Sequence, residues 1–176
     1  MTTIAVKRND DGSLDIGWDS KVTPEGHHPG KAKVINDQFV LGIAGYCRYS
    51  DILQYTSVPP IHPADLEDPD YDFRGYIITQ VIPKWIDVLE KSYEQDPDFH
   101  KDWLKGHVVI AVGTHVYSIV EDFAVIEHLD HFAIGSGGKY ALAALHLGRS
   151  VKRALEMAAT LDPGTDGPFT IIKNWK

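Results

Sequence analysis

Thr2, the second residue of the chain, combines a nucleophile with a possible base of its own. If Met1 is removed, Thr2 holds a hydroxyl and a free α-amine on a single residue. A hydroxyl is a poor nucleophile at neutral pH and must lose its proton to a nearby base. An α-amine has an unperturbed pKa of about 7.7–8.0, so a useful fraction is neutral and can accept that proton. The sequence therefore permits catalysis by an N-terminal nucleophile, provided that Met1 is lost.

Two further groups would assist such a nucleophile. A lysine close to the amine favours its neutral form by charge repulsion, and Lys31 and Lys33 both stand at the start of a predicted strand. An oxyanion needs a donor, which the backbone amide of Gly45 could supply at the end of FVLGIAG. Taken alone, this is a weak signal, because threonine after methionine is common and is inert in most proteins.

The elements that would position these residues run in the order strands, helix, strands, helix and strand. Asp-Gly turn chemistry and apolar runs predict two hairpins, and helical spacing of apolar residues predicts two helices, the first kinked or started by Pro83. The predicted strands cover 3–8, 14–20, 32–35, 39–45, two segments within 107–120, then 122–128, 131–135 and 168–174. The predicted helices cover 75–95 and 136–161. Both 122–128 and 131–135 are expected to extend the sheet formed by 107–120.

This order favours an α+β fold with antiparallel sheets, because the helices are grouped between sets of strands. The proline-rich acidic segment 56–74 predicts an irregular loop. With 176 residues, 19.6 kDa and 43% hydrophobic residues, the chain has the size of one compact domain. We therefore expect a single domain over residues 1–176.

Composition also excludes several classes of function. The net charge of −8, from 25 acidic and 17 basic residues, argues against a duplex nucleic-acid binder and against binding to an anionic membrane surface. No apolar stretch is long enough to span a bilayer, and no secretory apolar segment follows Met1. Cys47 is the single cysteine, so no intrachain disulfide can form and a reducing compartment fits. We expect a cytoplasmic protein.

Two short motifs suggest ligands but are better explained by ordinary structure. The run SGG at 136–138 lacks the spacing and lysine of a phosphate-binding loop, so it predicts a strand-to-helix turn. His128 and His131 lie near acidic residues, but a strand-turn-strand would direct their side chains to different faces. We expect no metal and no organic cofactor.

Several motifs together resemble a known family. TTIAVKR, GWDS, AKVI, LGIAG, AIGSGGKYALAAL and LDPGTDGPF occur in the order and approximate spacing of proteasome β-type subunits. They are most similar to HslV-type bacterial peptidases, which are threonine peptidases of the N-terminal-nucleophile hydrolase superfamily. The resemblance covers about 1–50 and 107–176 and is loose over 52–106. It implies a four-layer αββα sandwich in which helices flank two antiparallel sheets.

The resemblance also implies roles for individual residues. Thr2 would be the nucleophile, Asp19 would pair with Lys33 beside it, and the Gly45 amide would stabilise the oxyanion. The positions that match the family's partners of the nucleophile's amine are Ser136, Asp162 and Thr165, the last in place of a frequent serine. The substrate backbone would add a strand to the sheet. The residues expected along or near that strip are Val22, Thr23, Lys31, Gly45 and Cys47.

The family further implies homo-oligomeric stacked rings, polypeptide substrates and a separate ring-forming ATPase unfoldase, since the chain has no Walker motif. Helix 75–95 and the acids of 65–72 are candidates for ring contacts. Lys31 and Arg48 suggest a preference for acidic side chains before the cut. Two alternatives remain open, namely a small-amide amidase of the same fold and a catalytically silent ring or scaffold subunit that retains Met1.

Overall fold

The computed structural model describes residues 2–22, 26–94 and 104–176, and its strands form two antiparallel sheets. The first sheet has the order β8-β1-β2-β9 and the second has the order β3-β4-β5-β6-β7. The strands are β1 (Thr3–Arg8), β2 (Leu14–Trp18), β3 (Ala32–Ile35), β4 (Phe39–Gly45), β5 (Gly106–Val112), β6 (His115–Ile119), β7 (Val125–Glu127), β8 (Phe132–Gly135) and β9 (Thr170–Trp175).

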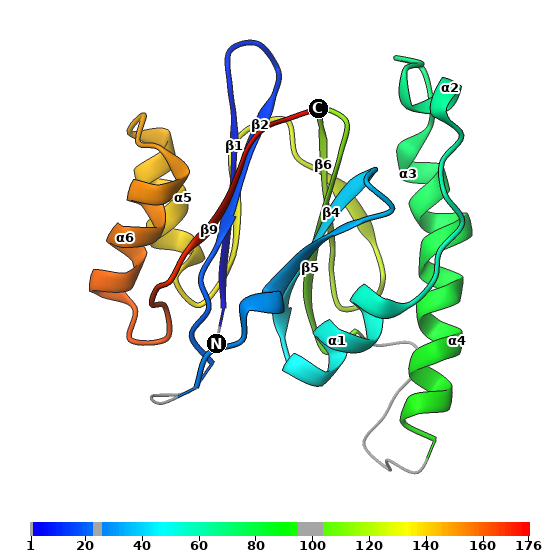
Figure 1. Ribbon diagram of the computed structural model, residues 1–176, viewed down its shortest axis with the longest axis horizontal. Helices are drawn as coiled ribbons and strands as arrows, with labels where there is room; N and C mark the ends of the chain where they lie inside the picture. The colour runs from blue at the N-terminus through cyan, green and yellow to red at the C-terminus, as the bar shows by residue number, and fades with distance from the viewer. Residues whose placement is uncertain (1, 23–25, 95–103) are drawn as a thin grey trace.

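Helices cover the outer face of each sheet, which gives the four αββα layers expected from the sequence (Figure 1). Helices α5 and α6 lie on the first sheet, and α1, α3 and α4 lie on the second. The helical segments are η1 (Pro29–Lys31), α1 (Cys47–Tyr55), α2 (Pro63–Leu66), α3 (Phe73–Tyr76), η2 (Ile77–Val81), α4 (Ile82–Ser92), α5 (Gly138–His146) and α6 (Val151–Leu161). None of the helices in these described ranges is long and apolar enough to cross a bilayer.

Three apolar clusters hold the four layers together, one at each interface. Ile4 and Val6 of β1 pack between the sheets with Val109 of β5, whereas Ala5 points the other way and packs under α5 and α6. Successive strand residues face opposite sides, so a single strand serves two interfaces. The largest cluster fills the space between the second sheet and its helices and includes Trp85.

The two predicted hairpins are confirmed, since β1 pairs with β2 and β3 pairs with β4. The predicted helix at 75–95 is present over its described residues as a helical run from α3 through α4, with the π-helical turn η2 just before Pro83. Proline lacks an amide hydrogen and cannot continue the regular bond to the carbonyl four residues back. The segment 56–74 is mostly irregular, with the single-turn helix α2 inside it.

Two predictions about the second half of the chain are wrong. Residues 131–135 do not extend the sheet of β5 to β7, because β8 crosses to the first sheet and pairs with β1. Residues 136–161 form two helices because Gly148, with φ of +76°, ends α5 in a Schellman motif. In that motif the Arg149 amide donates to the Ala144 carbonyl and the Gly148 amide to the Leu145 carbonyl. Ser150 then caps α6.

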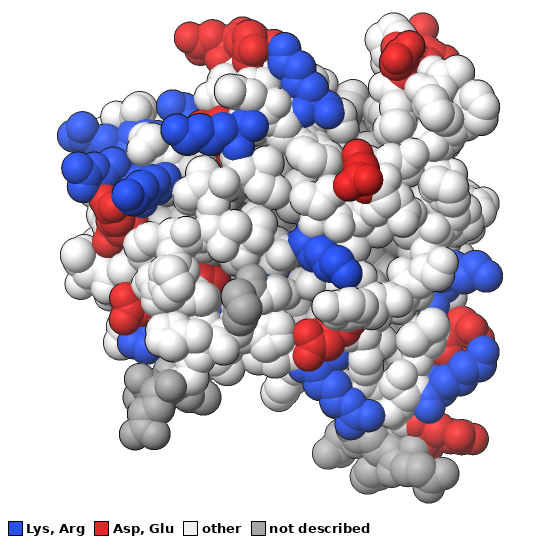
Figure 2. Space-filling model, viewed as in Figure 1, with Lys and Arg blue, Asp and Glu red and all other residues white. Residues whose placement is uncertain are grey.

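The negative net charge is not spread evenly over the surface. Figure 2 shows Lys and Arg side chains gathered over the layer of α5 and α6, at the left of the view. Arg149, Lys152 and Arg153 are exposed members of this layer. The whole-chain charge of −8 therefore does not describe this face.

Candidate active site

Thr2 lies directly before β1, where β8 ends, and only 6% of its surface is exposed. The Ser136 amide donates to the Thr2 carbonyl at 3.0 Å. Gly135 has φ of +93°, and a Cβ there would lie 1.7 Å from the Thr2 carbonyl oxygen. Only glycine fits this position, because it tolerates the left-handed backbone and brings no side chain against Thr2. The glycine at 135 thus serves close packing against the start of β1.

Thr3, which the sequence did not single out, is fixed from three directions. Its amide donates to Asp19 Oδ1 at 2.7 Å, and its hydroxyl accepts from the Gly137 amide at 3.1 Å. The same hydroxyl lies 2.5 Å from Thr165 Oγ1. A Cβ on Gly137 would lie 2.5 Å from both hydroxyl oxygens. The second glycine of SGG therefore makes room for this contact, and the motif is the strand-to-helix turn that was expected.

Ser136, Asp162 and Thr165 meet beside this strand start, although 26 or more residues separate the first from the others. Asp162 Oδ2 accepts from Ser136 Oγ and from Thr165 Oγ1, each at 2.6 Å, and Oδ1 accepts from the Gly164 amide at 3.1 Å. Burial alone would raise the pKa of Asp162, but these donors outweigh burial and hold the pKa below its usual value. The carboxylate is therefore anionic at neutral pH.

Asp19 and Lys31 form a buried ion pair below Thr3. Lys31 Nζ donates to both oxygens of Asp19, at 3.0 and 2.9 Å, and also to the Lys21 carbonyl. The side chain of Lys31 is 3% exposed and that of Asp19 is 0% exposed. Burial lowers the pKa of Lys31, and the hydrogen bond and charge of Asp19 counter that shift. Because Asp19 also accepts from the Thr3 amide, it links the ammonium of Lys31 to the backbone next to Thr2.

The expected pairing of Asp19 with Lys33 is wrong. Lys33 lies within β3, where Ala32 and Val34 point into the core between the sheets, so Lys33 points to the opposite face. There its Nζ lies 3.8 Å from the centre of the Tyr55 ring on α1. Lys31 precedes the strand, in the η1 turn, and this different backbone direction sends it toward β2.

The residues expected to meet substrate are more exposed. Gly45 ends β4 at the surface, and a Cβ there would lie 2.8 Å from the Lys105 carbonyl oxygen. Tyr46 is 67% exposed and half-buried Cys47 begins α1. The Val22 amide donates to the Gly26 carbonyl. Thr23 lies outside the described residues.

The two cations that suggested an acidic preference are engaged elsewhere. Lys31 is paired with Asp19, and Arg48 donates to the Ser92 carbonyl at 3.1 Å and packs over the Tyr93 ring. The structural basis for that preference is therefore lost.

The two histidines that suggested a metal site, His128 and His131, each contact another group. His128 Nε2 lies 2.8 Å from Ser118 Oγ, while His131 Nδ1 accepts from the Arg8 amide. Across residues 2–22, 26–94 and 104–176, no three His, Cys, Asp or Glu side chains are grouped to hold a metal ion.

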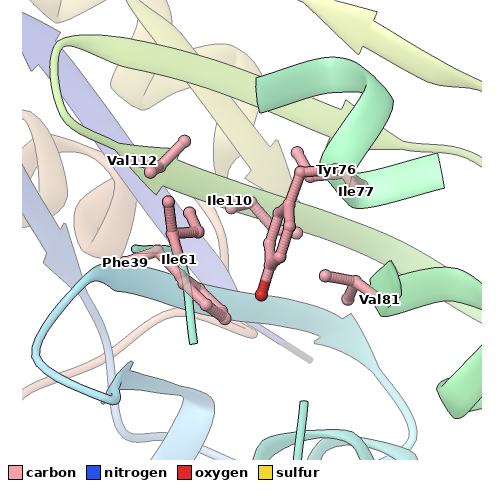
Figure 3. A pocket seen from close by; sticks show the side chains of 7 residues that line it. All are labelled: Phe39, Ile61, Tyr76, Ile77, Val81, Ile110 and Val112. Carbon is pink, nitrogen blue, oxygen red and sulfur yellow. The ribbon is translucent and has the colours of Figure 1, made fainter. Parts of the chain in front are cut away.

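A small apolar pocket lies in the core under the helices of the second sheet and takes no part in this site. Figure 3 shows its side chains coming from β4, β5, the loop at Ile61 and the run of α3 and η2. Its lining side chains leave essentially no space for a water molecule. Phe39 lines it from the end of β4 opposite to Gly45. This pocket belongs to the core.

Comparison with solved structures shows what this arrangement is similar to. BPH of Thiobacillus denitrificans in complex with epoxomicin superposes with a TM-score of 0.68 at 18% identity, covering 97% of this chain and 96% of that chain. Another structure of the same protein gives a TM-score of 0.66 at 17% identity, with 98% and 96% covered. HslV of Trypanosoma brucei gives 0.63 at 20% identity, with 98% of both chains covered.

The chain has the HslV and proteasome β-type fold. No family model and no curated protein matches the sequence. The HslV-type fold is therefore recognised through its architecture, and sequence identities of 17–20% leave the chemistry to be argued from the residues.

Proposed function

We propose that residues 1–176 form one N-terminal-threonine peptidase domain that acts once Thr2 carries a free α-amine. One observation carries the proposal: Thr3, the residue after Thr2, contacts two buried polar groups that meet only in the folded chain. Its hydroxyl lies against Thr165 in the cluster of Ser136, Asp162 and Thr165, and its amide donates to Asp19 of the Asp19–Lys31 pair. The HslV-type fold supports it.

In the proposed reaction, Thr2 Oγ1 attacks the carbonyl carbon of a peptide bond and its proton passes to the α-amine of Thr2. The oxygen of the tetrahedral intermediate becomes anionic and accepts a hydrogen bond from the Gly45 amide. When the carbon–nitrogen bond breaks, the departing amine takes the proton from the α-amine, and an ester on Thr2 remains. Water, deprotonated by the same amine, hydrolyses the ester and restores the hydroxyl.

The surrounding residues keep the amine ready for this step. The positive charge of Lys31, held by Asp19, disfavours protonation of a nearby amine. Ser136 and Thr165 orient Asp162, which can accept a hydrogen bond from the amine and fix its direction. The substrate backbone would run past Val22, Thr23 and Cys47 as an added strand.

Covalent labelling tests the proposal. The intact mass of the purified protein first establishes whether Thr2 is N-terminal, since a retained Met1 would block the amine. A peptide epoxyketone is then added, because it forms a stable ring only by reacting with both the hydroxyl and the amine of one residue. We expect one adduct on Thr2, lost in Thr2→Ala and kept in Cys47→Ala. Absence of any adduct on protein with a free Thr2 would overturn the proposal.

We also propose that the domain works in the cytoplasm as stacked homo-oligomeric rings, supplied with unfolded polypeptide by a separate ATPase. The likeness to HslV and the single cysteine support this assignment. Native mass spectrometry tests the assembly, with a series of multimers as the expected result. A spectrum that contains only monomer at micromolar concentration would contradict it.

A further inference from the structure

The direction of Lys31 depends on the short turn that carries it. Lys31 is the last residue of η1, a single 3-10 turn, and Gly30 immediately precedes it. A segment this short has few hydrogen bonds of its own. Its conformation is therefore set by the groups that bind its backbone from outside.

One buried amide provides the main contact. The Gly30 carbonyl accepts from Gln54 Nε2 at 2.6 Å and, more weakly, from Ser50 Oγ at 3.4 Å. Gln54 is 4% exposed and also donates to Ser50 Oγ at 2.9 Å. Residues 50 and 54 are one turn apart on α1, so both side chains leave the same face of the helix. This face of α1 is built around the Gly30 carbonyl.

Gln54 is itself held in place, and a second contact supports it. Tyr49 and Leu53 anchor α1 in the core below the second sheet. At the start of η1, His28 Nε2 lies 3.1 Å from Asp51 Oδ1. The turn is therefore attached to α1 through its N-cap residue His28 and through Gly30, and α1 is fixed to the body of the protein.

We propose that Gln54 is a positioning residue, which holds the Gly30 carbonyl so that Lys31 stays against Asp19 and keeps its charge next to Thr2. The proposal rests on the peptidase function proposed above. In the part of the chain that the structure describes, the Gln54 side chain binds the Gly30 carbonyl and Ser50, and its effect on Lys31 passes through the backbone of η1. Without the Gln54 donor, the partly buried Gly30 carbonyl keeps only the longer contact with Ser50 Oγ, and the turn relaxes.

The consequence appears in the pH dependence of the reaction. The α-amine must be neutral to act as base, so kcat/KM rises with pH through the pKa of that amine. If Lys31 moves away, the amine binds its proton more tightly and the rise shifts to higher pH. If Gln54 had a merely structural role, replacing it would lower the folded fraction without moving the pH at which kcat/KM rises, the acidic limb of the profile.

Gln54→Met tests this, with Gln38→Met as the matched control. Gln38 also donates to a backbone carbonyl, that of Ile61, at 2.6 Å, and contacts neither η1 nor Asp19 in the described structure. We expect the acidic limb of kcat/KM to move up by about half a pH unit or more in Gln54→Met. In Gln38→Met the limb should stay in place even if urea unfolding shows a comparable loss of stability. An unmoved limb in Gln54→Met would overturn the proposal.

Two further measurements keep the test decisive. If Gln54→Met does not fold, Ser50→Ala weakens the same contact, and a shift in the same direction but smaller is expected. The ¹³Cε resonance of Lys31 reports its environment without any turnover, and its titration should change in Gln54→Met and remain as in the wild type in Gln38→Met. If wild-type protein with a free Thr2 cannot be labelled, the peptidase proposal fails, while this titration still decides whether Gln54 positions Lys31.

Discussion

The two sides of the site differ in how they are built. On the side of the first sheet, the polar groups of Thr3, Ser136, Asp162 and Thr165 bind one another over 2.5–2.6 Å. On the side of the second sheet, Gly45 is exposed at the end of β4 and is followed by the exposed Tyr46. Lys31 is the group from the second side that reaches across, to Asp19.

This difference separates two tasks. The groups that would generate the nucleophile are buried and satisfied, so removing one leaves another without its partner and costs stability as well as rate. The groups that would meet substrate are exposed, so changing them alters binding while the fold is retained. The variants below test this division, from the largest expected effect to the smallest.

Removing the buried cation should have the largest effect. Lys31→Ala leaves the Asp19 carboxylate buried without its charge partner, which costs about 3–5 kcal/mol of stability. We expect little or no labelling by the epoxyketone in the protein that remains folded. Lys33→Ala loses a partly exposed contact with Tyr55 and should cost about 1 kcal/mol or less. Urea unfolding and labelling rates measure both, and equal effects would contradict the assignment of Lys31.

A glycine next to Thr2 provides the second test. Gly135→Ala places a methyl group 1.7 Å from the Thr2 carbonyl oxygen and also incurs a left-handed backbone cost of about 1–2 kcal/mol. Gly148 has φ of +76°, and a Cβ added there would have no atom within 4 Å. Gly148→Ala should therefore show only the cost of the left-handed backbone. Gly135→Ala should therefore lose more stability and nearly all activity. Thermal unfolding and peptide hydrolysis compare the pair, and activity close to wild type in Gly135→Ala would be the contrary result.

Removing the hydroxyl of Thr165 should have a smaller effect on the buried cluster of Thr3, Ser136, Asp162 and Thr165. Thr165→Val keeps the shape but removes the donor to Asp162 and the partner of Thr3, at a cost of about 1–3 kcal/mol. Thr165→Ser keeps the hydroxyl and should retain most of the activity. Steady-state kinetics should show a lower kcat in Thr165→Val. If both variants behave alike, the hydroxyl has no role in the site.

Asp162 predicts a dependence on pH. Its pKa in the folded state is below the ordinary 3.8, so the stability that it contributes is complete above that pH and is lost as the pH falls through the lowered value. We expect Asp162→Asn to be less stable than wild type near neutral pH, with the difference closing in strong acid. Urea unfolding at a series of pH values measures this difference. A difference that is independent of pH would show that Asp162 does not act through its charge.

A change at the exposed residues after β4 should alter substrate binding and leave the stability of the fold nearly unchanged. Tyr46→Ala removes a side chain that is 67% exposed, so the stability should change by about 0.5 kcal/mol or less. We expect a change in KM with little change in kcat. A loss of kcat comparable with that of Thr165→Val would break the division between the two sides.

Local sequence signals predicted the secondary structure well where a single pattern of turn or apolar residues was clear. The hairpins of β1 with β2 and β3 with β4 follow from turn residues and apolar alternation. The break at Gly148 was missed although LHLGRS carries a glycine C-cap and a serine N-cap, because the apolar pattern continues across it. The partner of β8 could not be predicted, since neighbouring strands in sequence do not always pair.

The candidate site also has features that the sequence predicts and features that it does not. The sequence by itself determined the candidate nucleophile and the motifs around it, because these depend on residue type and order. Only the tertiary structure decided that Lys31, and not Lys33, pairs with Asp19, and that Thr3 contacts both Asp19 and Thr165. Two lysines separated by one alanine are equivalent in a sequence. The backbone of η1 and the packing of Ala32 direct the two lysine side chains to opposite faces. Burying the ammonium of Lys31 costs desolvation energy, which only the contact with Asp19, a residue distant in the sequence, can offset.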